Sequence, residues 1–224
     1  MHVFLFDIDG TLISSGGAGQ AALYGAMTTE FGVDAPKSVP IHGLTDRTIA
    51  SSLFEQHGIE NSHENFKRLI RSYLELLPES LSKKQGSILA GVAELLELLA
   101  QRSNAAIGLL TGNVADGAKI KLNHFGLHHY FSFGGYGDHH HRREDVAAEA
   151  FQAAREHLNG SAVLERTYVI GDTPNDIRCA KHIGARVMAV CTGNYSADQL
   201  SQERPDWLVN DLSDPTDVLT LLDA

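Results

Sequence analysis

Two aspartates separated by one residue follow an apolar run near the start of the chain. The run, Val-Phe-Leu-Phe at positions 3–6, leads directly into Asp7, Asp9 and Gly10. A short run rich in β-branched and aromatic side chains predicts a strand buried on both faces, as in the middle of a parallel sheet. Two carboxylates this close repel by about 4 kcal/mol at an effective dielectric constant of about 20, so a cation is expected beside them. A divalent metal ion is the simplest candidate.

Other polar residues occur where later strands are expected to end. In an open parallel sheet the carboxyl ends of the strands share one edge, where such sheets bind their ligands. Residues distant in the sequence are therefore expected to meet Asp7 and Asp9 in one crevice. These residues are Thr111 and Asn113 after a strand at 105–110, Arg142 or Arg143 beyond the next strand, and Asp172 and Asp176 after a strand at 166–170.

This set of side chains suits the chemistry of a phosphoryl group. Three carboxylates around one point favour a hard cation, and an octahedral Mg²⁺ held by two side chains, a backbone carbonyl and waters is the natural occupant. The Thr111 hydroxyl, the backbone N–H groups after Asp9 and Thr111, and a guanidinium would bind phosphoryl oxygens. Phosphoryl transfer also needs a nucleophile, for which a carboxylate is suited, and a proton donor.

Strands and helices alternate through the second half of the chain, which predicts an α/β fold with a doubly wound, Rossmann-like parallel sheet. The first strand, at 3–6, belongs to the same sheet. The later strands are expected at 105–110, 130–133, 166–170, 186–190 and 207–209, with helices at 91–102, 144–158 and 216–222 and after Asn113 and Asp176.

Residues 14–86 have a different pattern, without a convincing strand. Helical spacing covers 20–31, 45–56 and 63–77, with Thr45 or Asp46 as N-cap of the second helix and Pro78 ending the third. This predicts a small all-helical cap domain at 14–86, inserted into a catalytic core made of residues 1–13 and 87–224.

Composition narrows the class of protein. A chain of 224 residues with 43% hydrophobic residues can bury a sizeable core, and the two cysteines suggest no disulfide framework. The net charge of −10 argues against nucleic acid as a partner, and no apolar run has the length of a membrane span. The expected location is the cytoplasm, because the N-terminus lacks the features of a signal peptide. The oligomeric state is left open.

The polar segments, taken together, resemble the motifs of a known family. Asp-Ile-Asp-Gly-Thr at 7–11, Leu-Leu-Thr-Gly-Asn at 109–113, Arg143, and Gly-Asp-Thr-Pro-Asn-Asp at 171–176 look like the four motifs of the haloacid dehalogenase-like hydrolase superfamily, in order and spacing. Gly-Gly-Ala-Gly at 16–19 and Gly-Leu-Thr-Asp-Arg at 43–47 further resemble the phosphoglycolate-phosphatase-like branch, whose helical cap follows the first motif.

The resemblance implies roles for individual residues. Asp7 would take the phosphoryl group as an aspartyl-phosphate, and Asp9 would protonate the leaving alcohol and then activate water. Burial and neighbouring carboxylates are expected to raise the pKa of Asp9 above the free value of about 3.9. The remaining roles are catalysis by Thr111 and Arg143, metal binding by Asp7, Asp172, Asp176 and the Asp9 carbonyl, and substrate contacts from Gly10, Thr11, Gly112, Asn113, Thr45 and Asp46.

One motif departs from the family pattern. Most members place a lysine where this chain has Arg142 and Arg143. Arg143 is the preferred candidate because it lies closer to the next helix, and Arg142 is the alternative. The run His139, His140 and His141 is interpreted as a solvated loop, and Lys119, Lys121 and Lys181 as exposed helix residues.

The sequence therefore predicts a hydrolase, namely a Mg²⁺-dependent phosphatase of a small, phosphoglycolate-like metabolite. A closing cap disfavours bulky substrates. A phosphosugar mutase, which uses the same two aspartates, is the alternative, although Thr11 after Gly10 favours the phosphatases by resemblance. A non-catalytic phosphate-binding module is the third possibility, and the presence of both Asp7 and Asp9 argues against it.

Overall fold

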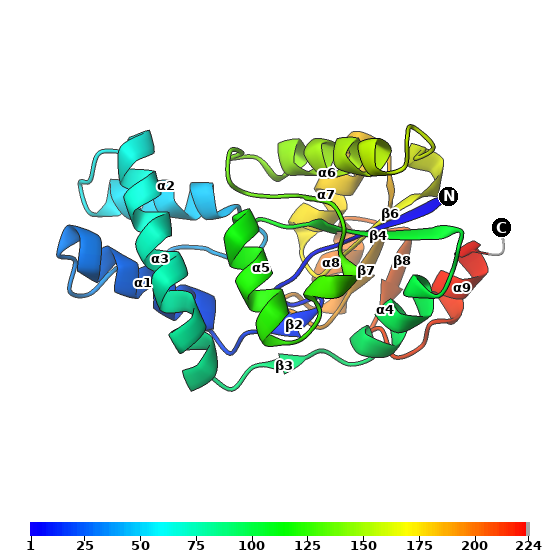
Figure 1. The fold of residues 1–224 in the computed structure, drawn as a ribbon, viewed down its shortest axis with the longest axis horizontal. Helices are drawn as coiled ribbons and strands as arrows, with labels where there is room; N and C mark the ends of the chain where they lie inside the picture. The colour runs from blue at the N-terminus through cyan, green and yellow to red at the C-terminus, as the bar shows by residue number, and fades with distance from the viewer. Residues whose placement is uncertain (223–224) are drawn as a thin grey trace.

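The computed structural model describes residues 1–222; residues 223 and 224, at the end of the expected core, lie outside the described part. Six parallel strands form one sheet in the order β5-β4-β1-β6-β7-β8, which places β1 inside the sheet (Figure 1). The strands are β1 (His2–Phe6), β4 (Ala105–Leu110), β5 (Gly134–Gly135), β6 (Thr167–Gly171), β7 (Arg186–Val190) and β8 (Trp207–Val209). The doubly wound α/β fold is confirmed.

Alternate residues of β1 pack into two separate cores. Phe4 and Phe6 lie in the cluster that includes side chains of α4 (Val92–Ala100), α5 (Ala115–His124) and α9 (Thr216–Leu222). Val3 and Leu5 lie in the cluster that includes α6 (Arg143–His157), α7 (Pro174–Ile183) and α8 (Ala197–Gln202). Successive side chains of a strand point to opposite faces, so a continuous apolar run serves both cores.

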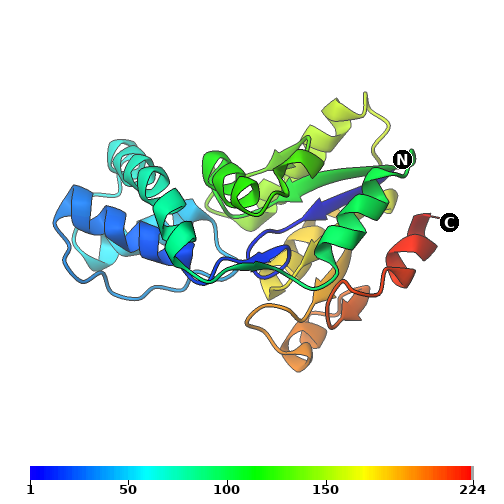
Figure 2. The ribbon, with the colours of Figure 1, turned by 60° about the horizontal axis from the view of Figure 1, so that its bottom comes forward.

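Three helices form a third core beside the sheet. They are α1 (Ala18–Phe31), α2 (Asp46–Gln56) and α3 (His63–Lys83), and their apolar side chains pack mainly on one another. Figures 1 and 2 place them at one end of the molecule, opposite the end that carries the N-terminus and α9 (Thr216–Leu222). None of the helices in residues 1–222 has the length and apolar character needed to cross a membrane.

Two short strands lie where the chain passes between the sheet and these helices. β2 (Ile13–Ser14) pairs antiparallel with β3 (Ser87–Ile88). The strands lie at the two positions where the sequence suggests a division, after residue 13 and before residue 87. We propose that this paired connection is the boundary between core and cap.

Two of the expected elements differ in the structure, and α8, β2 and β3 are additional to those expected. Residues 130–133 are not a strand: the 3₁₀ helix η1 (His128–Tyr130) precedes the two glycines of β5. A Cβ on Gly135 would lie 2.3 Å from the Val146 carbonyl oxygen of α6, so this strand position requires glycine. The second difference is α3, which continues through Pro78. Burial of Leu77 and Leu81 in the cap core offsets the hydrogen bond that proline removes.

Candidate active site

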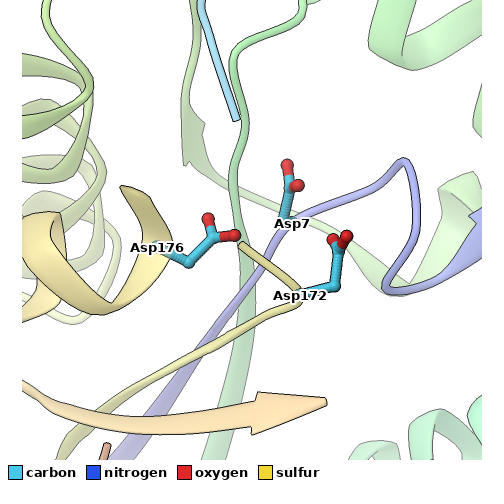
Figure 3. A group of neighbouring side chains, drawn as sticks. All are labelled: Asp7, Asp172 and Asp176. Atoms are coloured by element: carbon cyan, nitrogen blue, oxygen red, sulfur yellow. The ribbon is translucent and has the colours of Figure 1, made fainter. Parts of the chain in front are cut away.

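Three buried aspartates meet at the carboxyl edge of the sheet. Asp7 follows β1, Asp172 follows β6, and Asp176 lies in the first turn of α7. Each contributes a carboxylate oxygen to a group whose members lie within 4.8 Å of one another, and Figure 3 shows the three side chains gathered around one small region. No other group of three or more acidic, histidine or cysteine residues within positions 1–222 offers such a set of ligand atoms.

A buried arginine lies against this group. Arg143 is the first residue of α6, its side chain is 5% exposed, and its Nη2 lies 2.9 Å from Asp7 Oδ1 and 2.6 Å from Asp176 Oδ1. Arg142 lies outside the site, with its side chain 65% exposed and paired with Glu144 at 3.6 Å. The structure therefore places Arg143, rather than Arg142, beside the expected nucleophile.

The charges of this group are not balanced by protein side chains. When all three carboxyls are ionised, three carboxylates against one guanidinium leave two negative charges in excess. Burial, followed by repulsion from Asp176 and Asp7, raises the pKa of Asp172 to about 8. Burial also raises the pKa of Asp7 to about 6, against the attraction of Arg143. A divalent cation would balance the excess, and the donors are the oxygen ligands that hard cations prefer.

The polar partners of Asp176 fix the geometry of the site. Its Oδ2 accepts hydrogen bonds from the Thr173 N–H (3.0 Å) and hydroxyl (2.7 Å), and Thr173 in turn caps α7. Its Oδ1 is buried without a well-oriented hydrogen bond, although Arg143 is close. One carboxylate oxygen therefore anchors the helix while the other faces the acidic group and is free to accept a further donor or ligand.

Asp9 has a different environment from the other aspartates. Its Oδ2 accepts hydrogen bonds from Lys121 Nζ (2.6 Å) and Asn113 Nδ2 (3.0 Å). Burial alone would raise its pKa, but the Lys121 charge and these hydrogen bonds hold the pKa below its ordinary value. The expectation that surrounding carboxylates raise the pKa of Asp9 is therefore wrong, because the group beside it is an ammonium.

The expected phosphate-binding residues lie beside Asp172 and Asn113. Thr111 is buried, and its hydroxyl accepts a 2.7 Å hydrogen bond from Asn113 Nδ2. Thr11 donates from its hydroxyl to Asp172 Oδ1 at 3.0 Å. Gly10 has a φ of +90°, and a Cβ there would lie 2.5 Å from Asp172 Oδ2. Only glycine allows the first loop to pass so close to this carboxylate.

The two expected cap residues contact the core directly. Thr45 caps α2 and its hydroxyl donates to the His141 carbonyl at 3.3 Å. Asp46 Oδ2 accepts the Val114 N–H at the start of α5 (2.8 Å), and the Asp46 N–H donates to the Gly112 carbonyl (2.7 Å). A Cβ on Gly112 would lie 2.0 Å from the Leu44 carbonyl oxygen. The start of α2 is therefore docked on the loop after β4.

A cavity of about 750 Å³ joins these residues to the cap. Asp7, Asp9 and Arg143 contribute to its core side, and Gln20, Leu23, Asp46 and Tyr73 contribute to its cap side. Burial raises the pKa of Asp46 to about 6 in spite of the nearby Lys121. The volume is in the range of pockets for small molecules.

Lys121 is the residue that sequence reasoning missed. It is not an exposed helix residue: it is 5% exposed and lines the cavity. The signal lies in the helical spacing, since Lys121 is four residues after Gly117 and adjacent to Leu122 on the buried face of α5. The histidine run lies largely in an exposed loop, with His140 within 3.2 Å of Glu149.

Comparison with known proteins gives concordant matches over nearly the whole chain. A family model described as haloacid dehalogenase-like hydrolase matches residues 4–190. A phosphoglycolate phosphatase from Synechococcus elongatus is 27% identical over 225 residues, covering 99% of each chain. Among solved structures, CbbY from Rhodobacter sphaeroides in complex with phosphate has a TM-score of 0.77 at 18% identity, covering 100% of both chains. A putative β-phosphoglucomutase from Thermotoga maritima has a TM-score of 0.63 at 22% identity, covering 98% of this chain and 99% of that one.

Proposed function

Because this chain belongs to the haloacid dehalogenase-like hydrolases and is a phosphatase-type enzyme of that family, we propose that it cleaves a small phosphate monoester through an aspartyl-phosphate on Asp7. The observation that carries the proposal is the position of the Asp7 carboxylate, buried at the sheet edge beside Arg143 and the other two aspartates. A carboxylate nucleophile divides one slow displacement into two faster ones.

The residues of the site support a balanced sequence of two steps. In the first, an Asp7 oxygen attacks phosphorus, the ester P–O bond breaks, and the leaving oxygen keeps the electron pair and takes a proton from Asp9, which must first bind a proton because Lys121 holds its pKa low. In the second, water attacks the phosphorus of the aspartyl-phosphate and gives a proton to Asp9. The acyl oxygen then leaves with its electron pair, which restores the Asp7 carboxylate and releases inorganic phosphate. Arg143 and the Thr111 hydroxyl would stabilise charge on the phosphoryl oxygens.

We propose that Mg²⁺ is the cation that the acidic group holds. The excess of two negative charges, the buried Asp176 Oδ1 without a hydrogen bond, and the all-oxygen donor set support a hard divalent ion. We propose Asp7, Asp172 and the Asp9 carbonyl as direct ligands, with Asp176 acting through water. When bound, the ion supplies positive charge that shields the nucleophile and the phosphoryl oxygens from one another.

The substrate is proposed to be a small, phosphoglycolate-like metabolite. The cavity lies between the core and the cap helices, and its volume suits a small molecule. The similarity to a phosphoglycolate phosphatase supports a substrate of this size class. A cytoplasmic location and the absence of nucleic-acid and membrane partners stay predictions from the sequence.

The first experiment measures inorganic phosphate released from an aryl phosphate with Mg²⁺, and again after the metal is removed with a chelator. We expect release that depends on the metal. A panel of small phosphorylated metabolites then ranks substrates by kcat/KM. A hexose phosphate separates the mutase alternative, because a mutase conserves organic phosphate while a phosphatase consumes it. Absence of release across the panel would favour a phosphate-binding module.

Replacement of Asp9 with asparagine is expected to impair turnover more than substrate binding. Asparagine keeps the size of the side chain but cannot give or take the required proton, so kcat should fall by roughly 10² to 10⁴. Substrate affinity should change little, since the phosphoryl-binding groups are untouched. Steady-state kinetics and a direct binding titration separate the two quantities, and equal kcat in variant and parent would remove the role proposed for Asp9.

Metal-free protein is expected to lose stability as the pH rises from about 4 to about 8. The folded-state pKa values of Asp7 (about 6) and Asp172 (about 8) lie above the ordinary value of 3.8, so folding favours their protonated forms. The stability that these two protonated carboxyls contribute is complete at pH values below the pKa of the unfolded state. It is lost as the pH rises through their folded-state pKa values. Mg²⁺ should therefore raise Tm more at pH 8 than at pH 5. Thermal unfolding with and without metal tests this, and an equal Tm increase at both pH values would contradict it.

A further inference from the structure

Lys121 stands out because a buried ammonium is costly and the fold alone does not require one. Its Nζ donates to Asp9 Oδ2 and to Asn113 Oδ1, both at 2.6 Å. Its position on α5 is flanked by residues with small or apolar side chains on the buried face of the helix. An apolar residue of similar length could fill that space, and replacing buried ion pairs with apolar residues is often neutral for stability. The contacts of Lys121 therefore point to a role at Asp9.

The contacts fix one oxygen of the Asp9 carboxylate. Lys121 Nζ and Asn113 Nδ2 both donate to Oδ2, while Oδ1 takes part in neither contact. Asn113 is itself held by Lys121 through its Oδ1 and by the Thr111 hydroxyl through its Nδ2. The Asp9 side chain is nevertheless 37% exposed and lines the cavity. A partly exposed carboxylate at the cavity is thus held at Oδ2 by Lys121 and Asn113, with Ser15 as a further hydrogen-bonding neighbour.

The cap closes the space around the ammonium. A Cβ on Gly19 of α1 would lie 3.3 Å from Lys121 Nζ and 3.9 Å from the Tyr73 hydroxyl oxygen of α3. Tyr73 also lies close to Gly117, one turn before Lys121 on α5. The Lys121 ammonium therefore lies against α1 and α3 of the cap.

We propose that Lys121 is a positioning residue that, together with Asn113, holds the Asp9 carboxylate in the orientation needed for proton transfer to the leaving oxygen. The proposal rests on the proposed phosphatase function and adds a residue to it. Lys121 touches neither Asp7 nor the acidic group in the contacts of residues 1–222; it acts through Asp9. Displacement of a proton-transfer group by about 1 Å can reduce a rate roughly 100-fold.

The test compares leaving groups. Lys121→Met and Lys121→Gln are measured on a series of phosphate monoesters, from aryl esters of strongly acidic phenols to alkyl esters. The kcat/KM of each ester reports the steps up to cleavage of the ester P–O bond, in which Asp9 gives its proton. An acidic phenol leaves without that proton, whereas an alkyl alcohol requires it.

We expect kcat/KM of the Lys121 variants to fall roughly 100-fold for alkyl esters and less than about 10-fold for the most acidic aryl ester. Asp9→Asn should show the same trend more strongly, and Lys121→Arg should recover part of the loss. Lys119→Met is the matched control, because Lys119 lies on the same helix but is exposed. It should leave the whole series unchanged.

The outcomes separate this inference from the proposed function. If the parent protein hydrolyses the esters and the variants lose the same factor for every leaving group, the positioning role is wrong and Lys121 is a structural residue. If the parent releases no phosphate from any ester, the proposed function fails, and the inference fails with it. Circular dichroism and thermal unfolding verify that each variant is folded; should Lys121→Met not fold, Lys121→Gln, which keeps a hydrogen-bond donor, decides the question.

Discussion

Replacement of Asp7 with asparagine is expected to reduce the rate of phosphate release by at least about 10⁴-fold, because the amide cannot form the aspartyl-phosphate. The change is nearly isosteric, so the site should keep its shape. Stability without metal should not fall at pH 8, since burial raises the pKa of Asp7 to about 6 and the charged form is the one that folding disfavours. Phosphate release and Tm are the two measurements.

The control for this variant is Asp145→Asn. Asp145 is an exposed residue in the first turn of α6, and the same substitution there should leave turnover within about twofold of the parent. A second readout is covalent labelling: the parent should form an acid-stable, base-labile phosphoprotein that the Asp7 variant lacks. Retention of more than a tenth of parental activity by Asp7→Asn would exclude Asp7 as the nucleophile.

The convergence of the candidate site residues could be predicted from the sequence because they follow strand ends. Asp7, Thr111 and Asp172 each come directly after a buried apolar run, and the parallel order of β4, β1 and β6 brings those ends together. The local signals at helix starts were equally informative: Thr45 is the N-cap of α2, one of the two residues that the sequence suggests. Such features depend on short stretches of chain and on a general property of parallel sheets.

Features that depend on tertiary contacts could not be predicted in this way. The strand β5 consists of Gly134 and Gly135, which have low strand propensity; Gly135 is explained by the approach of α6 and Gly134 by the closeness of Leu109 in β4. The pKa of Asp9 depends on Lys121, a residue 112 positions away whose burial is not evident from its type. Lysine on a helix is usually exposed, and only the neighbouring small and apolar residues indicate otherwise.

Replacement of Arg143 with methionine is expected to lower kcat/KM by roughly 10³-fold, because a guanidinium that stabilises phosphoryl charge contributes on this scale. It should also reduce the free energy of unfolding by about 3 kcal/mol, since Asp7 and Asp176 lose their shared buried partner. Arg143→Lys should recover part of the activity, because a point charge at this position keeps the attraction but not both contacts.

The matched control is the adjacent Arg142→Met. The Arg142 side chain is exposed and pairs only with Glu144 among the described residues, so turnover should stay within about twofold and stability within about 0.5 kcal/mol. Steady-state kinetics and denaturant unfolding measure both effects. A larger loss in Arg142→Met than in Arg143→Met would reverse the assignment of the two arginines.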